Sequence, residues 1–294
     1  MDIRVAEQAG FCFGVQRAYN MALAATEVTD GPLCSWGPLI HNPQVVHFLE
    51  GRGLKVITEL NEVSRGARVV IRSHGVSPEI FRGLRKRGAQ VIDATCPFVK
   101  KAQSKLSQLE KEGYQVLLLG DRAHAEVQTL IGYAQSEVEI INGLSDLATV
   151  GLGKRVGVLS QTTQGEAVLK DVVSYLSTKT HELKVFNTIC GFTAARSRVA
   201  LRMAGEVDLL LVVGGKSSAN TARLRDTCRV VLPDTYQVET SDEIKPDWLN
   251  GKSKIGITAG ASTPQWVILE VINRLRDLVS AREPKEALLA FLKP

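Results

Sequence analysis

Residues 91–103 read VIDATCPFVKKAQ, and this stretch decides how the rest of the chain is interpreted. A β-leaning segment ends near Cys96, and an amphipathic helical pattern begins directly after it. Residues 185–197, VFNTICGFTAARS, and residues 4–18, RVAEQAGFCFGVQRA, show the same order. The sequence therefore contains a strand–cysteine–helix element three times, at Cys12, Cys96 and Cys190.

Two further elements follow each cysteine in the same order. The second is an apolar segment that leads to a polar residue 28 or 29 positions after the cysteine, namely His41, His124 and Ser218. The third is a β-branched strand that breaks into a polar turn, at residues 68–78, 155–165 and 254–264. Between the second and third elements lie matching acidic turns, VITELNEV (56–63), IINGLSDL (140–147) and QVETSDEI (237–244).

The repeat predicts three similar α/β modules of ordinary domain size. Because strands alternate with helices, each module is expected to hold a parallel sheet with right-handed crossovers. The predicted boundaries are 13–96, 97–190 and 191–294. The third module lacks a closing strand of its own, so we expect residues 1–12 to complete it and relate the modules by a pseudo-threefold axis.

Composition narrows the function classes. Of 294 residues, 44% are apolar and 23% charged, as in soluble globular proteins, and no apolar run approaches the ~20 residues of a membrane helix. Asp2 and Glu7 interrupt any signal-peptide pattern, which favours a cytoplasmic location. The net charge of +5 comes with 5% aromatic residues and no base-stacking motif, so no nucleic-acid partner is expected. Five cysteines in such a chain favour metal or catalytic use over disulfides.

Three cysteines at equivalent positions are expected to face one axis. Each precedes a helix, whose N-terminus favours a thiolate. Thiolates suit zinc, copper(I) or iron–sulfur clusters, and three of them leave one coordination position open on a four-iron cluster or on tetrahedral zinc. Cys34 and Cys228 lie outside the repeat and are expected to be ordinary buried or partly buried thiols.

The remaining polar loop residues indicate an anion site and an acid. Six of them donate hydrogen bonds or carry positive charge, as a phosphate or diphosphate site requires: His41, His74, His124, Ser218, Asn220 and Ser262. Glu126 is the one carboxylate among these loop residues and is the expected proton donor. Thr162 and Thr163 are expected to orient or relay the proton.

At these residues the sequence resembles the 4-hydroxy-3-methylbut-2-enyl diphosphate reductases of the non-mevalonate isoprenoid pathway. The motifs that carry the resemblance span nearly the whole chain: GFCFGV (10–15), HN (41–42), SHGVS (73–77), DATCP (93–97), HAEV (124–127), SQTT (160–163), VVGGKSSAN (212–220) and TAGASTP (258–264). One departure is Ala219, where some members of the family have a serine.

The resemblance implies a trefoil of three α/β domains around a 4Fe–4S cluster held by Cys12, Cys96 and Cys190. It implies that the open iron binds the substrate hydroxyl and that the six histidine, serine and asparagine residues named above hold the diphosphate. Glu126 matches the proton-delivering acid and Thr162 the hydroxyl beside it. The implied reaction removes the allylic hydroxyl as water, gives isopentenyl and dimethylallyl diphosphates, and draws single electrons from a ferredoxin or flavodoxin.

Two other function classes remain open at this point. The first is an iron–sulfur or zinc sensor or binding module, which would not need Glu126 or the diphosphate-type loops. The second is a zinc-dependent hydrolase of a phosphorylated substrate, for which three thiolates are a poor choice. Metal identity separates the hydrolase from the reductase, and turnover with a reduced dye separates the reductase from the sensor.

Overall fold

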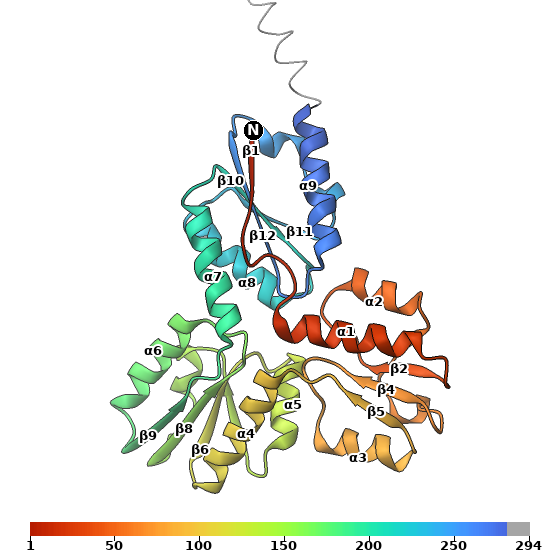
Figure 1. Cartoon of the computed structure of the whole chain (residues 1–294). Helices are drawn as coiled ribbons and strands as arrows, with labels where there is room; N and C mark the ends of the chain where they lie inside the picture. The colour runs from red at the N-terminus through yellow and green to blue at the C-terminus, as the bar shows by residue number, and fades with distance from the viewer. Residues whose placement is uncertain (281–294) are drawn as a thin grey trace, which may run out of the picture. The chain divides into compact units, whose positions relative to one another are not determined.

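Three four-stranded parallel sheets make up the computed structural model, which describes residues 1–280 (Figure 1). Residues 281–294, the end of the third predicted module, lie outside the described residues. The prediction of an α/β protein with three similar modules and parallel sheets is confirmed. No helix among residues 1–280 has the length and apolar character to cross a membrane.

The first sheet has the order β3-β2-β4-β5. Its strands are β2 (Leu33–Trp36), β3 (Leu54–Ile57), β4 (Arg68–Ile71) and β5 (Gln90–Asp93). The helices between them and beside them are α1 (Phe13–Glu27), α2 (Pro43–Glu50) and α3 (Pro78–Lys86). Helix α3 packs Leu84 into a core with Trp36 and Ile71, and α1 runs along the other side of the sheet in Figure 1.

The second sheet repeats this topology with the order β7-β6-β8-β9. Its strands are β6 (Gln115–Leu119), β7 (Val138–Ile141), β8 (Arg155–Ser160) and β9 (Glu182–Phe186), and its helices are α4 (Pro97–Lys111), α5 (Ala125–Tyr133) and α6 (Glu166–Ser177). Helices α4 and α5 share one core with Val116 and Leu118 of β6. Helix α6 packs against the opposite face, on Leu117 and Leu119. The unbroken apolar run of β6 follows from burial on both faces.

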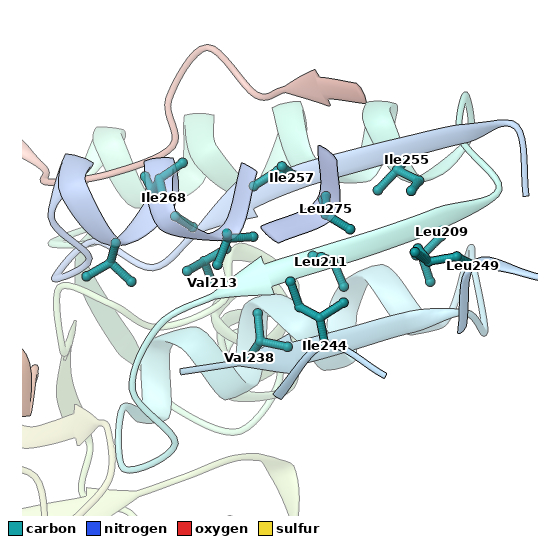
Figure 2. Close-up of a cluster of buried hydrophobic side chains, with 13 residues drawn as sticks. Leu209, Leu211, Val213, Val238, Ile244, Leu249, Ile255, Ile257, Ile268 and Leu275 are labelled. Atoms are coloured by element: carbon teal, nitrogen blue, oxygen red, sulfur yellow. The ribbon is translucent and has the colours of Figure 1, made fainter. Parts of the chain in front are cut away.

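The third sheet has the order β1-β12-β10-β11. Its strands are β1 (Asp2–Val5), β10 (Leu209–Val213), β11 (Thr235–Val238) and β12 (Lys254–Ala259), and its helices are α7 (Gly191–Ala204), α8 (Ala219–Arg229) and α9 (Gln265–Ser280). Figure 2 shows Ile268 and Leu275 of α9 over Leu211 and Val213 of β10. The first strand of the chain pairs in parallel with the last, with Val5 opposite Ile257.

Each of the three acidic turns noted in the sequence forms a short 3-10 helix. These helices are Leu60–Glu62, Leu144–Ala148 and Ser241–Glu243. In each, a carboxylate accepts the backbone N–H of the residue four positions earlier: Glu62 from Thr58 at 2.9 Å, Asp146 from Asn142 at 2.6 Å and Glu243 from Glu239 at 3.0 Å. The repeat therefore extends from the order of the strands to single hydrogen bonds.

The chain divides into two compact units. The first unit consists of Met1–Cys12, His41–Val45 and the chain from Ala195 onward, and it contains the third sheet. The second unit consists of Phe13–Ile40 and Val46–Ala194 and contains the other two sheets. The module boundaries at residues 13–96, 97–190 and 191–294, with residues 1–12 joined to the third module, are kept as a proposal.

Arg68 connects β4 to the end of α1 inside the second unit. Its side chain is 7% exposed and donates to the carbonyls of Ala25, Val28 and Asp30 at 2.7, 2.6 and 2.9 Å. A cation is favourable there because the carbonyl end of a helix carries partial negative charge. The arginine thus satisfies carbonyls that the last turn of α1 cannot pair itself.

We expect Arg68→Met to lower the free energy of unfolding by about 3 kcal/mol, because it keeps the apolar stem but removes the donors from three carbonyls. Urea denaturation monitored by circular dichroism measures this difference. The control is Arg65→Met, three residues earlier at an exposed position, which should change stability by less than about 0.5 kcal/mol. Equal effects of the two variants would contradict the role given to Arg68.

Candidate functional site

The predicted site residues all follow the carboxyl ends of strands, where parallel α/β sheets bind ligands. In the first unit these residues are Cys12, His41, Ser218, Asn220 and Ser262. In the second unit they are His74, Cys96, His124, Glu126, Thr162 and Cys190.

The loops of Cys96 and His74 are joined in the second unit. The Cys96 N–H donates to the Ser73 carbonyl at 2.9 Å, next to His74. The His74 ring meets the His124 ring edge to face, with centroids 5.2 Å apart. The structure thus brings together two histidines that are 50 residues apart in the sequence.

His124 also caps the N-terminus of α5. Its Nδ1 accepts the Glu126 N–H at 3.1 Å, which assigns the proton of the neutral ring to Nε2. The cap fixes the ring at the start of a helix, where the N–H groups and the helix dipole favour an anion. His124 is therefore oriented by the same turn that positions Glu126.

Glu126 lies in the first turn of α5 and is 1% exposed. It accepts the Thr162 N–H at 2.6 Å through one carboxylate oxygen and the Thr162 hydroxyl at 2.7 Å through the other. Burial raises the pKa of Glu126 to about 6, although both hydrogen bonds from Thr162 act to lower it. A carboxyl with this pKa holds a proton near neutral pH far more often than an exposed glutamate, as a general acid requires.

Thr162 connects Glu126 to Cys190, the other cysteine of the repeat in the second unit. The Cys190 N–H donates to the Thr162 carbonyl at 2.8 Å. Thr188, two residues before Cys190, is buried and accepts the Ser160 N–H at 2.9 Å. A continuous series of contacts therefore runs through the second unit from the Cys96 loop, by way of the two histidines, Glu126 and Thr162, to Cys190.

Gly14, in the first turn of α1, leaves the space into which Cys96 points. A Cβ atom at Gly14 would lie 2.5 Å from the Cys96 sulfur, closer than real contacts allow. Arg17, one turn later, donates to the carbonyls of Thr95 and Asp93 at 3.3 and 3.4 Å. Neither residue was predicted as part of the site, although Gly14 belongs to the GFCFGV motif that drew attention to Cys12.

In the first unit, the loop after β12 joins Cys12 to His41. The Cys12 N–H donates to the Ala261 carbonyl at 3.1 Å, and the neighbouring Ser262 hydroxyl donates to the His41 carbonyl at 3.0 Å. Arg196 of α7 is 6% exposed and donates to the Gly10 carbonyl at 2.8 Å, at a glycine with a φ of 111°. Arg196 was also missed by the sequence prediction, because nothing local connects it to residue 10.

Ser218 caps the N-terminus of α8. Its hydroxyl oxygen accepts the Thr221 N–H at 3.3 Å and the Thr221 hydroxyl at 3.0 Å. Gly260 permits close packing here, since a Cβ atom would lie 2.1 Å from the Thr221 hydroxyl oxygen. Ala219 and Asn220 occupy the first turn of α8, where backbone N–H groups have no partner within the helix. A backbone N–H is therefore present at Ala219.

The two remaining cysteines are buried in the cores, as predicted. Cys34 lies in β2 and Cys228 in α8, at 5% and 0% exposure. Burial raises the pKa of both thiols, that of Cys228 to about 11. Neutral thiols of this kind are poor metal ligands and poor nucleophiles.

Fold and site together define a class: an α/β enzyme with cysteine thiols, helix N-termini and a buried acid at the carboxyl ends of its strands. The LytB protein family matches residues 3–276. The chain belongs to this family.

Named relatives extend over nearly the whole chain. A Geobacter metallireducens protein named 4-hydroxy-3-methylbut-2-enyl diphosphate reductase is 46% identical over 282 residues, which are 96% of this chain and 99% of the relative. An Aquifex aeolicus protein of the same name is 41% identical and covers 95% of this chain and 97% of its own length.

Two solved structures have related folds. One, described as (E)-4-hydroxy-3-methyl-but-2-enyl diphosphate reductase, the terminal enzyme of the non-mevalonate pathway, is 41% identical with a TM-score of 0.72 and covers 94% of this chain and all of its own. The other, the E-1-hydroxy-2-methyl-but-2-enyl-4-diphosphate reductase of Plasmodium falciparum, is 26% identical with a TM-score of 0.87, and covers 92% of this chain and 87% of its own.

The raised pKa of Glu126 predicts a specific pH dependence of stability. Between pH 4.5, the ordinary value, and about pH 6, the folded protein holds this proton more tightly than the unfolded chain. Stability therefore falls as the pH rises through this window, by about 2 kcal/mol for a shift of this size. The Glu126→Gln variant should not show this loss of stability between pH 4.5 and about pH 6.

The measurement is urea unfolding of the metal-free protein and of Glu126→Gln at pH 4.5 and pH 7.5. Relative to Glu126→Gln, the wild type should lose about 2 kcal/mol of unfolding free energy when the pH is raised from 4.5 to 7.5. A difference that stays constant with pH would show that Glu126 titrates as an ordinary glutamate.

Proposed function

We propose that this chain reduces 4-hydroxy-3-methylbut-2-enyl diphosphate to isopentenyl and dimethylallyl diphosphates, the last step of the non-mevalonate isoprenoid pathway. The substrate takes up two electrons and two protons, its allylic C–O bond breaks, and the oxygen leaves as water. The observation that carries this proposal is the buried Glu126–Thr162 pair, which is in hydrogen-bonded contact with the Cys190 loop.

The residues present suit an iron–sulfur cofactor, and we propose one 4Fe–4S cluster per chain with Cys12, Cys96 and Cys190 as its thiolate ligands. Cys96 and Cys190 directly precede the first residues of α4 and α7, and helix N-termini stabilise thiolates. Gly14 leaves the Cys96 sulfur unobstructed by a side chain. When bound, a cluster with three protein ligands supplies single electrons and one Lewis-acidic iron for the substrate.

We assign the diphosphate to six residues, three imidazoles and three neutral donors: His41, His74, His124, Ser218, Asn220 and Ser262. His124 and Ser218 cap the N-termini of α5 and α8, so each stands beside backbone N–H groups that favour an anion. Ser262 contacts the His41 backbone, and His74 contacts the His124 ring. These contacts support a shared role in diphosphate binding for Ser262 and His41 in the first unit and for His74 and His124 in the second.

Glu126 holds the proton that the departing hydroxyl needs. Its burial excludes water, and its pKa of about 6 keeps a useful protonated fraction at neutral pH. When Glu126 is protonated, its O–H can donate to the Thr162 hydroxyl oxygen, 2.7 Å away. Thr162 then passes its own proton onward, while its N–H keeps the other carboxylate oxygen in place.

The proposal also names the partners and the location. The substrate is an allylic diphosphate, and the electrons come one at a time from a ferredoxin or flavodoxin in the cytoplasm. The chain contains no dinucleotide fingerprint, since GGKSSAN lacks the G-x-G-x-x-G spacing. Nothing in the charge or aromatic content points to nucleic acid or membrane as a partner.

The deciding experiment determines iron, acid-labile sulfide and zinc per chain in protein purified without oxygen, followed by turnover with a dithionite-reduced viologen dye. About four irons with matching sulfide and release of both products would support the reductase. Zinc without sulfide after attempted reconstitution would favour the hydrolase. A cluster without turnover would favour the sensor.

Glu126→Gln should reduce turnover at least about 100-fold while the iron content stays the same, because the amide keeps the shape of the carboxyl but cannot supply the proton. Dye-driven product formation and iron analysis measure the two quantities. The matched control is Glu166→Gln at an exposed position on α6, which should retain full activity. Near-normal turnover in Glu126→Gln would remove the acid from the mechanism.

Gly14→Ala should lower the iron content after reconstitution to less than about half, because the added methyl group collides with the Cys96 sulfur. The fold itself should persist, since alanine is the better helix former. The control is Gly191→Ala, at the start of α7, where a Cβ atom meets nothing within 4 Å. Iron content unchanged in both variants would mean that the Cys96 sulfur does not need its observed position.

A further inference from the structure

Each cysteine of the repeat is followed within two residues by a phenylalanine: Phe13 after Cys12, Phe98 after Cys96 and Phe192 after Cys190. All three phenylalanines belong to the second unit. Phe13 and Phe192 stack with ring centroids 6.4 Å apart and planes 14° apart. Phe98 meets Phe192 edge to face at 6.1 Å. We call these three side chains the aromatic patch.

Two rings of the aromatic patch are exposed and the third, Phe98, is half-buried, although aromatic rings of this size are usually buried. Phe13 is 51% exposed and Phe192 is 46% exposed. Single exposed apolar residues are common and need no explanation. Two exposed rings that stack, with a half-buried third ring against one of them, are a different matter. They come from three repeats and follow the three proposed ligands within two residues, and together they suggest a surface that another molecule covers.

Helix α4, which carries Phe98, is basic, because Lys100, Lys101, Lys105 and Lys111 outnumber its one acid, Glu110. Helix α1 has one cation, Arg17, one turn after Phe13, and one acid, Glu27, at its far end. None of the three helices that follow the cysteines has an acidic residue in its first turn, where carboxylates are ordinarily favourable. A surface with this charge attracts an acidic partner.

The charged groups around the patch leave it positive. Lys100 pairs with Asp93 at 2.6 Å, Lys105 lies over the Phe186 ring at 4.5 Å, and Arg17 is held by carbonyls of the Cys96 loop. Lys101 lies exposed three residues after Phe98, on the same side of α4. Asp93, the last residue of β5, thus neutralises one of these cations, Lys100.

We propose that the aromatic patch, with the cations of α1 and α4, is the docking surface for an acidic electron-carrier protein. This inference rests on the proposed reductase function. Each encounter oxidises the carrier by one electron and reduces the enzyme by one, so two encounters support one turnover. Two residues along the chain span at most about 8 Å, so a carrier on this patch stands close to the proposed ligands Cys96 and Cys190.

The test compares Lys101→Glu with Lys111→Glu, assayed with two reductants. Both lysines are exposed on α4, and both substitutions change the net charge equally, but Lys111 lies about 15 Å further along the helix. The probe is a reduced, acidic plant-type ferredoxin. Lys101→Glu should raise its KM about fivefold and leave viologen-driven turnover within about twofold of wild type. Lys111→Glu should resemble the wild type with both reductants.

A second pair tests the aromatic rings. Phe192→Ser should raise the ferredoxin KM about fivefold with unchanged iron content, whereas Tyr175→Ser, at an exposed ring on α6, should not. Equal effects of the two lysine variants, or equal loss with dye and ferredoxin, would overturn the proposal. So would a Phe192→Ser variant that alters only the sedimentation of the enzyme, which would make the patch a contact between copies of this chain.

Failure of the reductase function gives a different result from failure of the docking surface. If the wild type does not turn over with reduced dye, the function is wrong. In that case, titration of the wild type and of both lysine variants into isotopically labelled ferredoxin still measures the surface by NMR shifts. Binding that is weakened by Lys101→Glu and not by Lys111→Glu would sustain the docking surface, and equal binding would reject it.

Discussion

The structure depends most on keeping one carboxyl group, that of Glu126, out of water. Removing an ionised carboxylate from solvent is costly unless it is hydrogen-bonded or protonated, and here both remedies operate. Thr162 donates to both carboxylate oxygens, and the pKa of about 6 shows that burial still outweighs these bonds. This balance constrains the neighbours: β8 must end so that both donors of Thr162 face α5, and His124 must cap the helix one residue before it begins.

The repeat meets these constraints with a single arrangement of strand, turn and helix, which is used three times. Parallel strands place all their carboxyl ends at the same edge of a sheet, so loops far apart in the sequence meet there without special devices. The helix N-termini at this edge serve different purposes. Those after Cys96 and Cys190 carry no acid in the first turn, which suits thiolates and an anionic cofactor, whereas α5 carries Glu126 in its first turn. Burial raises the pKa of that carboxyl and overrides the two hydrogen bonds from Thr162 that act to lower it.

Much of this was predictable, and the reasons are physical. The three cysteine elements, the parallel sheets and the acidic turns repeat locally, and local patterns survive in a single sequence. Contacts between distant segments do not. The Arg196 bond to Gly10 spans 186 residues and was not predicted, and the Thr162 hydroxyl beside Glu126, 36 residues away, was expected only from the family resemblance. The role of Gly14 depends on where the Cys96 sulfur points, which no pattern within α1 encodes. The three-module boundaries and the ligand assignments stay predictions.

The pairing of β1 with β12 has a consequence for how Cys12 reaches its position. Its loop is held by the Ala261 carbonyl and, through Gly10, by Arg196, so its partners lie in the last third of the chain. Forming these contacts closes a loop of well over a hundred residues, which is slow compared with the local pairing in the second unit. Cys96 and Cys190, by contrast, belong to a unit whose two sheets are complete by residue 186. In the proposed ligand set, Cys12 is therefore the thiol whose loop forms last, after the strands β10 and β12 have folded.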